Sequence, residues 1–282
     1  MIEKIKSNLF ASFFLSKAHF ARRYKRFHLG VFWTFFPTIL VLIGAYVSSK
    51  QLDLESFGFK IHYVGYVIIP FIVFRSITET FDVSQKLIQL SFILQRSLNI
   101  KSHQIITACL MSSFFHLSLD IITAIIILTY FHESLSHLSW LYFIFIFYSV
   151  FIGVFISIIL GPVCMLIYDL RFISKFLRVI ILACTPIFYI IPKDGIVYIL
   201  NKFNPFTKLI TSSRDVVFYG LTHDVKIILF IIPVTIIIFI LSLKLLEKQI
   251  KIINSTPVKG VVGQTYAWNL IFKTPLSNDK SK

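Results

Sequence analysis

The sequence predicts an all-α protein that crosses a membrane about six times, and three observations lead to this prediction. Of the 282 residues, 56% are hydrophobic and only 15% are charged, whereas about a quarter of the residues of a soluble domain are charged. The apolar residues collect into runs near the ~20 residues that a helix needs to cross a bilayer. Lys and Arg gather mainly in segments that flank these runs, as expected for cationic cytoplasmic loops.

The formal net charge of +15 would by itself also fit a nucleic-acid-binding protein. No basic stripe occurs outside the segments that flank the apolar runs. We therefore interpret the positive charge as retention of loops on the cytoplasmic side, and we expect no nucleic acid partner.

Residues 1–29 are predicted to form an amphipathic helix that lies in the membrane interface. At about 100° per residue, one helical face carries an apolar and aromatic set, made of Leu9, Phe13, Phe20, Tyr24 and Phe27. Arg22, Lys25 and Arg26 fall on the other side and would face anionic headgroups. A cleaved targeting segment is the alternative, but Lys17 interrupts its apolar run and no small-residue cleavage site follows.

Residues 30–248 are predicted to be the transmembrane region, and residues 249–282 a polar cytoplasmic tail. Six spans are expected at 31–48, 63–74, 105–130, 140–168, 176–191 and 225–246. The second of these is short, and an extension through "RSITETF", residues 75–81, on a surface that faces protein stays open. The moderately apolar segment 80–104 is expected to be a cytoplasmic loop. Cations cluster before the first span, after the second, after the fourth and in the tail, which places both ends of the chain in the cytoplasm.

The connection between the fifth and sixth spans does not read as a plain loop. It contains two short apolar pieces, too short to cross a membrane, and Asn204-Pro205 separates them. This pattern predicts a pair of short re-entrant or surface helices. Irregular backbone at membrane depth lies against protein or a water-filled cavity, so a lined pathway is expected nearby.

Motifs for chemistry are absent from the sequence. It contains no H-E-x-x-H, no G-x-S-x-G and no G-x-x-x-x-G-K-[ST]. The three cysteines form no C-x-x-C pair and predict no metal site. His116 and Asp120 lie one turn apart on the same helical face and could pair. The pair could have a functional role, or it could form hydrogen bonds to another helix that orient the third span. We expect no catalytic residue, no metal and no cofactor bound by this chain.

"RRYKRFHLGVFWTFFP", from Arg22 to Pro37, joins a basic run to "LG", a Trp and a Pro at the first predicted span. "YDLRFISKF" precedes the fifth predicted span and "TPIFYI" ends it. Asn204, Pro205, Thr207, Ile210 and Arg214 then follow in the spacing "NP-x-T-x-x-I-x-x-x-R". Together these four segments resemble one family, the membrane subunits of ABC-2 type exporters for bacterial polysaccharides (O-antigen, capsule and teichoic acid).

The resemblance implies a permease in the inner membrane that works as a homodimer and moves a lipid-linked polysaccharide. ATP would be hydrolysed by a separate ATPase subunit. The implied ATPase contacts are Arg96, Asn99 and Lys101, which could equally be positive-inside charges. The candidates for an aromatic substrate path are Trp33, Phe36, Tyr46 and Tyr189, with lipid-facing aromatics as the alternative. The candidates for contact with headgroups or a substrate pyrophosphate are Arg22, Arg23, Lys25 and Arg26.

Two other functions stay open from the sequence. One is an ABC-2 type exporter of drugs or small lipids. The other is an integral-membrane enzyme that acts on lipid-linked sugars, against which the absence of paired acidic residues argues.

Overall fold

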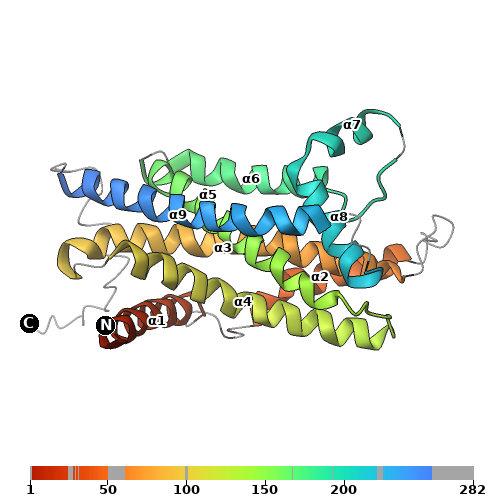
Figure 1. The fold of residues 1–282 in the computed structure, drawn as a ribbon, viewed down its shortest axis with the longest axis horizontal. Helices are drawn as coiled ribbons and strands as arrows, with labels where there is room; N and C mark the ends of the chain where they lie inside the picture. Colours follow the sequence, from red (N-terminus) through yellow and green to blue (C-terminus); the bar gives the residue numbers. More distant parts are fainter. Residues whose placement is uncertain are drawn as a thin grey trace, which may run out of the picture.

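The computed structural model describes residues 2–24, 28, 30, 32–49, 61–98, 101–166, 168–192, 194–220 and 225–255. In these ranges the chain forms α-helices, one short 3-10 helix and no strand, in accord with the predicted all-α class (Figure 1). The helices are α1 (Ile2–Tyr24), α2 (Phe32–Ser49), α3 (Tyr63–Leu98), α4 (Ser102–Tyr130), η2 (Ser139–Leu141), α5 (Tyr142–Leu166), α6 (Tyr168–Cys184), α7 (Ile196–Phe203), α8 (Pro205–Phe218) and α9 (Val225–Ser255).

Five helical segments in the described part of the chain are long and apolar enough to cross a membrane. They are Phe32–Ser49, Tyr63–Leu90, Ser102–Tyr130, Ser139–Gly161 and Phe230–Gln249. This is consistent with a helical, multi-pass membrane protein. All five correspond to predicted spans, but the boundaries differ in ways that have physical causes.

The second predicted span is much longer than its sequence indicated. The prediction gave it residues 63–74, left open an extension through 75–81, and placed a cytoplasmic loop at 80–104, but α3 continues as one helix to Leu98. Polar residues after Phe74 made the segment look like a loop. Ser76, Thr80 and Ser84 are nevertheless fully buried, because they face neighbouring helices rather than water.

The fifth predicted span, 176–191, is wrong as a continuous helix. α6 begins earlier, at Tyr168, and ends at Cys184 after 17 residues. Pro186 disfavours helical backbone at the residue before it, and the Thr185 hydroxyl donates to the Leu182 carbonyl at 2.9 Å. A non-helical stretch, residues 185–192, follows; we call it the turn segment. At the other end of the chain, α9 extends past the predicted boundary at 248–249 to Ser255.

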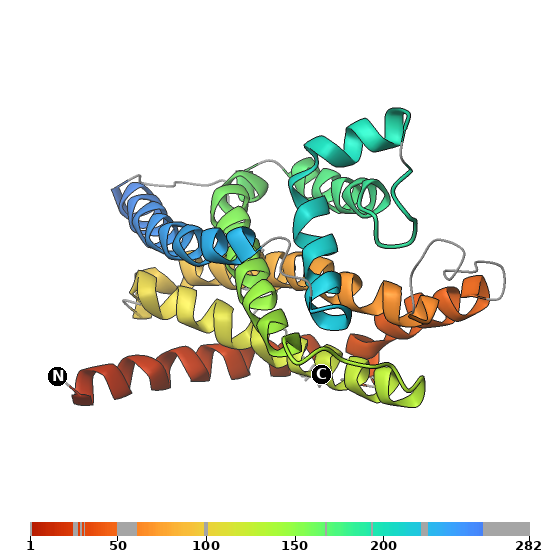
Figure 2. The same ribbon diagram turned by 45° about the vertical axis from the view of Figure 1, so that its right-hand side comes forward.

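Helix α1 lies alongside the first half of α4 (Figures 1 and 2). The Gln104 side-chain amide donates to Asn8 Oδ1 at 2.9 Å, and the hydroxyls of Ser12 and Thr107 lie 3.1 Å apart. Residue numbers increase together along both helices, so they run in the same direction. The polar residues of α1 face α4, while Phe10 and other apolar side chains are exposed. The predicted position of α1 in the membrane interface stays a prediction.

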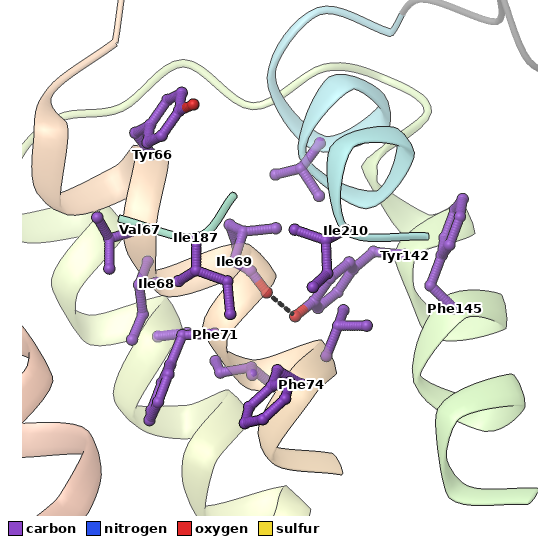
Figure 3. Close-up of a cluster of buried hydrophobic side chains, with 14 of the residues drawn as sticks. Tyr66, Val67, Ile68, Ile69, Phe71, Phe74, Tyr142, Phe145, Ile187 and Ile210 are labelled. Carbon is purple, nitrogen blue, oxygen red and sulfur yellow. Dashed lines mark hydrogen bonds between the residues drawn. The ribbon is translucent and has the colours of Figure 1, made fainter. Parts of the chain in front are cut away.

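Helices α3 and α5 form the centre of the bundle and pack side by side in parallel. The Tyr142 hydroxyl donates to the Ile69 carbonyl, 73 residues away, at 2.8 Å (Figure 3). Gly153 lies against Thr80, so these two residues are also 73 positions apart in the sequence. Ser149, Gly153, Ser157 and Gly161 repeat every four residues, so small side chains line this face of α5. Such residues allow two helix backbones in a membrane to approach closely.

Candidate functional site

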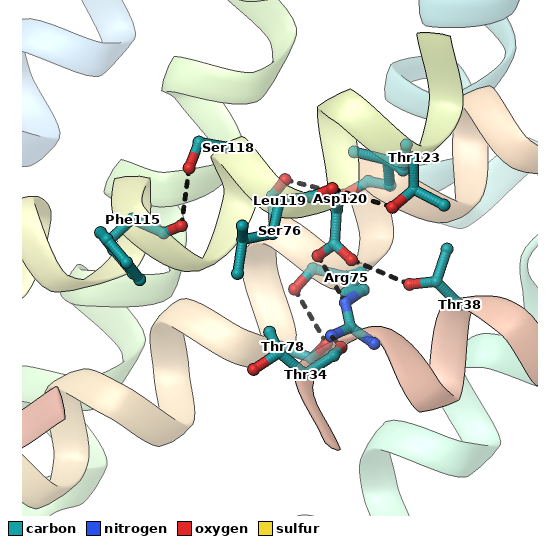
Figure 4. Close-up of polar contacts among 11 residues, drawn as sticks. Thr34, Thr38, Arg75, Ser76, Thr78, Phe115, Ser118, Leu119, Asp120 and Thr123 are labelled. Atoms are coloured by element: carbon teal, nitrogen blue, oxygen red, sulfur yellow. Dashed lines mark hydrogen bonds and ion pairs between the residues drawn. The ribbon is translucent and has the colours of Figure 1, made fainter. Parts of the chain in front are cut away.

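A buried ion pair joins three helices in the bundle (Figure 4). Nε of Arg75, on α3, lies 2.6 Å from Asp120 Oδ2, on α4, and their side chains are 8% and 0% exposed. The Thr38 hydroxyl, on α2, donates to Asp120 Oδ1 at 2.9 Å. The Arg75 guanidinium also donates to the carbonyl of Thr34. Each oxygen of the carboxylate therefore has a donor, and the pair holds α2, α3 and α4 together.

The partner of Asp120 is thus Arg75 rather than His116. The ring of His116 instead lies near that of Phe20, with ring centroids 5.4 Å apart. Of the two interpretations of Asp120 from sequence, this geometry agrees with the structural one, in which interhelical hydrogen bonds orient α4. Sequence reasoning missed Arg75, which comes directly after the short run predicted as span two.

The turn segment forms a second polar region, where it is held against the start of α3. The Tyr63 hydroxyl donates to the Phe188 carbonyl at 2.6 Å, and the Tyr66 hydroxyl donates to the Tyr189 carbonyl at 3.3 Å. Ile187 is fully buried among the side chains of α3, α5 and α8 (Figure 3). Two tyrosines and one isoleucine therefore attach the turn segment to the bundle.

Arg214, on α8, lies over the ring of Tyr66. Its guanidinium carbon is 3.6 Å from the centroid of the Tyr66 ring, and the residue is only 3% exposed. Its Nε and Nη1 have no hydrogen-bond partner among the residues that the structure describes. The cation–π contact accounts for part of the cost of burying this charge.

Asn201 connects α7 to its surroundings and is the buried residue of that helix. Its amide nitrogen donates to the Val197 carbonyl at 2.8 Å and to the Tyr189 hydroxyl at 3.0 Å. Its amide oxygen accepts a hydrogen bond from the Thr207 hydroxyl at 3.0 Å. One side chain thus links α7, the turn segment and α8.

The predicted break between the two short helices is confirmed. Asn204 ends α7, and its side chain accepts from the Phe206 backbone N–H at 3.0 Å as the N-cap of α8. Pro205 is the first residue of α8, where its missing N–H costs nothing. The Asn204 amide also donates to the Cys184 carbonyl at 3.2 Å, which ties the corner to the end of α6.

A pocket of about 410 Å³ opens between the end of α6, the turn segment and α7. It is lined by Ala183, Cys184, Tyr189, Ile190, Pro192, Val197, Leu200 and Asn201. Of the four aromatic residues predicted to line a path, Tyr189 alone lines this pocket.

The other three predicted path residues lie on α2 and are exposed on the described chain. Trp33 and Phe36 contact one another, with ring centroids 5.3 Å apart. Tyr46 lies 6.5 Å from the ring of Phe131. Because α2 packs on α3 and α4, while Tyr189 lies beside α7, the structure does not gather the four rings into one lining.

The predicted basic and coupling residues fall largely outside what the structure describes. Arg22 and Arg23 lie in the last turn of α1, and Arg96 near the end of α3, but their side chains are outside the described part. Lys25, Arg26 and Asn99 are outside the described residues altogether. Lys101 directly precedes α4 and is exposed, and its backbone N–H donates to Gln104 Oε1 at 2.9 Å.

Within the described ranges, no group of three or more His, Cys, Asp or Glu side chains is placed to hold a metal ion. Comparison with known proteins adds no assignment: no family model matches the chain, and no curated protein matches it.

Proposed function

We propose that this chain is the membrane subunit of an ABC-2 type exporter that moves a lipid-linked polysaccharide across the inner membrane. Two copies would form one pathway, and a separate ATPase subunit would supply the energy of ATP hydrolysis. The observation that carries this proposal is the pair α7–α8. Its corner is the Asn204-Pro205 pair of the motif through which the sequence resembles the exporter family, and a pocket lies beside it.

The proposal includes six crossings with both chain ends in the cytoplasm. Five of them correspond to the long apolar helices. The sixth is α6, whose 17 residues span about 26 Å at 1.5 Å per residue, close to the ~30 Å thickness of the hydrocarbon core. The turn segment then completes the crossing, and α7 and α8 lie at the outer face.

Exposed apolar surface on α6 supports the homodimer. The side chains of Phe172, Ile173, Phe176, Leu177, Val179 and Ile180 are each at least 47% exposed. These residues occupy more than one face of the helix, and α6 packs on the bundle mainly through α5. A second copy of the chain could cover one of these faces while lipid covers the other.

Tyr189 is the path residue that the geometry favours, because it lines the pocket beside α7. Trp33, Phe36 and Tyr46 would face the path from α2 of either copy. Arg22, Arg23, Lys25 and Arg26 would meet headgroups or a substrate pyrophosphate on the inner side, and Arg96, Asn99 and Lys101 would contact the ATPase.

Purification of the full-length chain from its own cells tests the proposal. We expect an ATPase subunit with a nucleotide-binding motif to co-purify. Charge reversal at Lys101 should weaken the stimulation of ATP hydrolysis by that subunit, while the amount of membrane-inserted chain stays unchanged. Chemical turnover of a lipid-linked sugar by the isolated chain would instead identify an enzyme. An associated ATPase together with unchanged surface polysaccharide, after deletion of the chain, would indicate an exporter of drugs or small lipids.

A further inference from the structure

The pocket beside α7 is apolar in character although two of its lining residues are polar. The Tyr189 hydroxyl donates to the Cys184 carbonyl at 3.1 Å and accepts from the Asn201 amide at 3.0 Å. The Asn201 side-chain amide also donates a hydrogen bond to the Val197 carbonyl and accepts one from the Thr207 hydroxyl. A ligand therefore finds few free polar groups inside, and hydrocarbon gains most by entering, since it leaves no polar group of its own unpaired.

Helix α7 also presents apolar side chains to its surroundings. Ile196 and Phe203 are 74% and 79% exposed, and Ile199 and Leu200 are both 54% exposed. Figure 2 shows α7 projecting from the bundle beyond the end of α6. In a membrane protein, a short helix with this surface lies among the acyl chains at the interface, so the pocket opens toward lipid.

Two exposed lysines flank the corner between α7 and α8. Lys202 follows the pocket residue Asn201, and Lys208 follows Thr207, whose hydroxyl bonds to Asn201. Asp194, which comes just before α7, is an exposed acidic residue. Lys and Arg side chains near a membrane surface attract anionic lipid headgroups. A lipid phosphate is therefore the partner that two exposed lysines beside an apolar pocket favour.

We propose that this pocket is a binding site for an anionic phospholipid of the bilayer. One acyl chain enters between the turn segment and α7, and Lys202 and Lys208 bind the phosphate. The volume of about 410 Å³ is within the range of small-ligand pockets and accommodates part of one chain. The site depends only on the membrane location of the chain, and not on the proposed export function.

Cys184 provides a direct probe of occupancy, because it lines the pocket and is exposed, whereas Cys109 and Cys164 are buried. The full-length chain is placed in nanodiscs of phosphatidylcholine with increasing phosphatidylglycerol. The rate of Cys184 alkylation by N-ethylmaleimide, a neutral reagent, is read by mass spectrometry of the peptide. If phosphatidylglycerol fills nine-tenths of the pockets, the rate falls about tenfold, since the reagent meets the empty fraction only.

The double variant Lys202→Gln/Lys208→Gln changes only exposed side chains and is expected to fold. Its Cys184 should react at nearly the same rate in both lipid mixtures. Lys244→Gln/Lys248→Gln, also exposed but on α9, is the matched control and should keep the wild-type response to phosphatidylglycerol.

Three results would overturn the proposal. One is an equal alkylation rate of wild-type Cys184 with and without phosphatidylglycerol. Another is an unchanged lipid response in the Lys202/Lys208 variant. The third is protection by added polyprenyl phosphate but not by phosphatidylglycerol, which would reassign the pocket to a lipid carrier.

Discussion

The centre of the bundle and helix α7 are built in opposite ways. In the bundle, α3 and α5 approach so closely that a Cβ on Gly153 would lie 2.7 Å from the Ile77 carbonyl oxygen, and an ion pair whose carboxylate is fully buried ties in α2 and α4. In α7, most side chains are exposed, and Asn201 is the buried residue that fixes the helix. The difference indicates a rigid scaffold that carries a weakly attached outer helix. Local stability follows the density of buried contacts, so α7 is the part expected to move.

The largest effect is expected from removal of one member of the buried ion pair. Asp120→Ala leaves the Arg75 guanidinium buried without its carboxylate, which costs about 3–5 kcal/mol. Thermal unfolding in detergent should show a large drop in stability. Asp120→Asn keeps the acceptor for Thr38 and should lose less. If Asp120→Ala were as stable as wild type, the ion pair would not contribute to the stability of the bundle.

The next effect concerns the contact between α3 and α5. A Cβ on Gly153 would lie 2.7 Å from the Ile77 carbonyl oxygen and 2.8 Å from Thr80 Cβ. Gly153→Ala should therefore destabilise the protein by about 1–3 kcal/mol, as overpacking does. Gly44→Ala on α2 is the matched control, because nothing lies within 4 Å of its Cβ position. Equal unfolding temperatures for the two variants would contradict the close contact.

Loss of Asn201 should loosen α7 and leave the bundle intact. Asn201→Ala removes the partner of the Tyr189 and Thr207 hydroxyls, a local cost of about 1–3 kcal/mol. Hydrogen exchange of the α7 amides should become faster, while exchange in α3 and α5 stays unchanged. Lys202→Ala, at the exposed neighbouring position, is the control. Faster exchange throughout the bundle would show that α7 is not an independent unit.

The smallest effect is a pH dependence at the junction between α3 and α4. Burial raises the pKa of Glu133 above its ordinary value of 4.5, although a hydrogen bond from the His62 backbone N–H opposes the shift. The folded state therefore binds this proton more tightly than the unfolded state. The resulting stability is present below about pH 4.5 and is lost as the pH rises through the raised pKa.

Glu133→Gln tests this sign, because it keeps an acceptor for the His62 N–H without the charge. The variant should match wild type in thermal stability near pH 4 and exceed it near pH 7. A variant less stable than wild type at neutral pH would show that the charged carboxylate stabilises the junction.

Features set by local chemistry could be predicted from the sequence. Asn204-Pro205 ends one helix and begins the next through its own side chain and ring, so the α7–α8 break was predicted correctly. Tyr189 lines a pocket, but its role as a path residue stays a prediction. The apolar runs located five helices in the described part of the chain that are long and apolar enough to cross a membrane, because the length of such a run follows from bilayer thickness.

Features set by distant partners could not be predicted. Thr80 and Ser84 look like loop residues until neighbouring helices bury them, so α3 is longer than the predicted span even with its extension through residue 81. Asp120 was paired with its helical neighbour because Arg75 lies 45 residues away in the chain. One signal was present but unused: the four-residue repeat from Ser149 to Gly161 marks the face of α5 that packs closely on α3.

The export of polysaccharide by cells that lack this chain tests the central proposal most directly. Surface polysaccharide is measured by immunoblot of intact cells, and lipid-linked polymer by extraction of the inner membrane. The account predicts that surface polymer disappears, that lipid-linked polymer accumulates inside, and that the wild-type chain restores export. Normal surface polysaccharide without internal accumulation would contradict it.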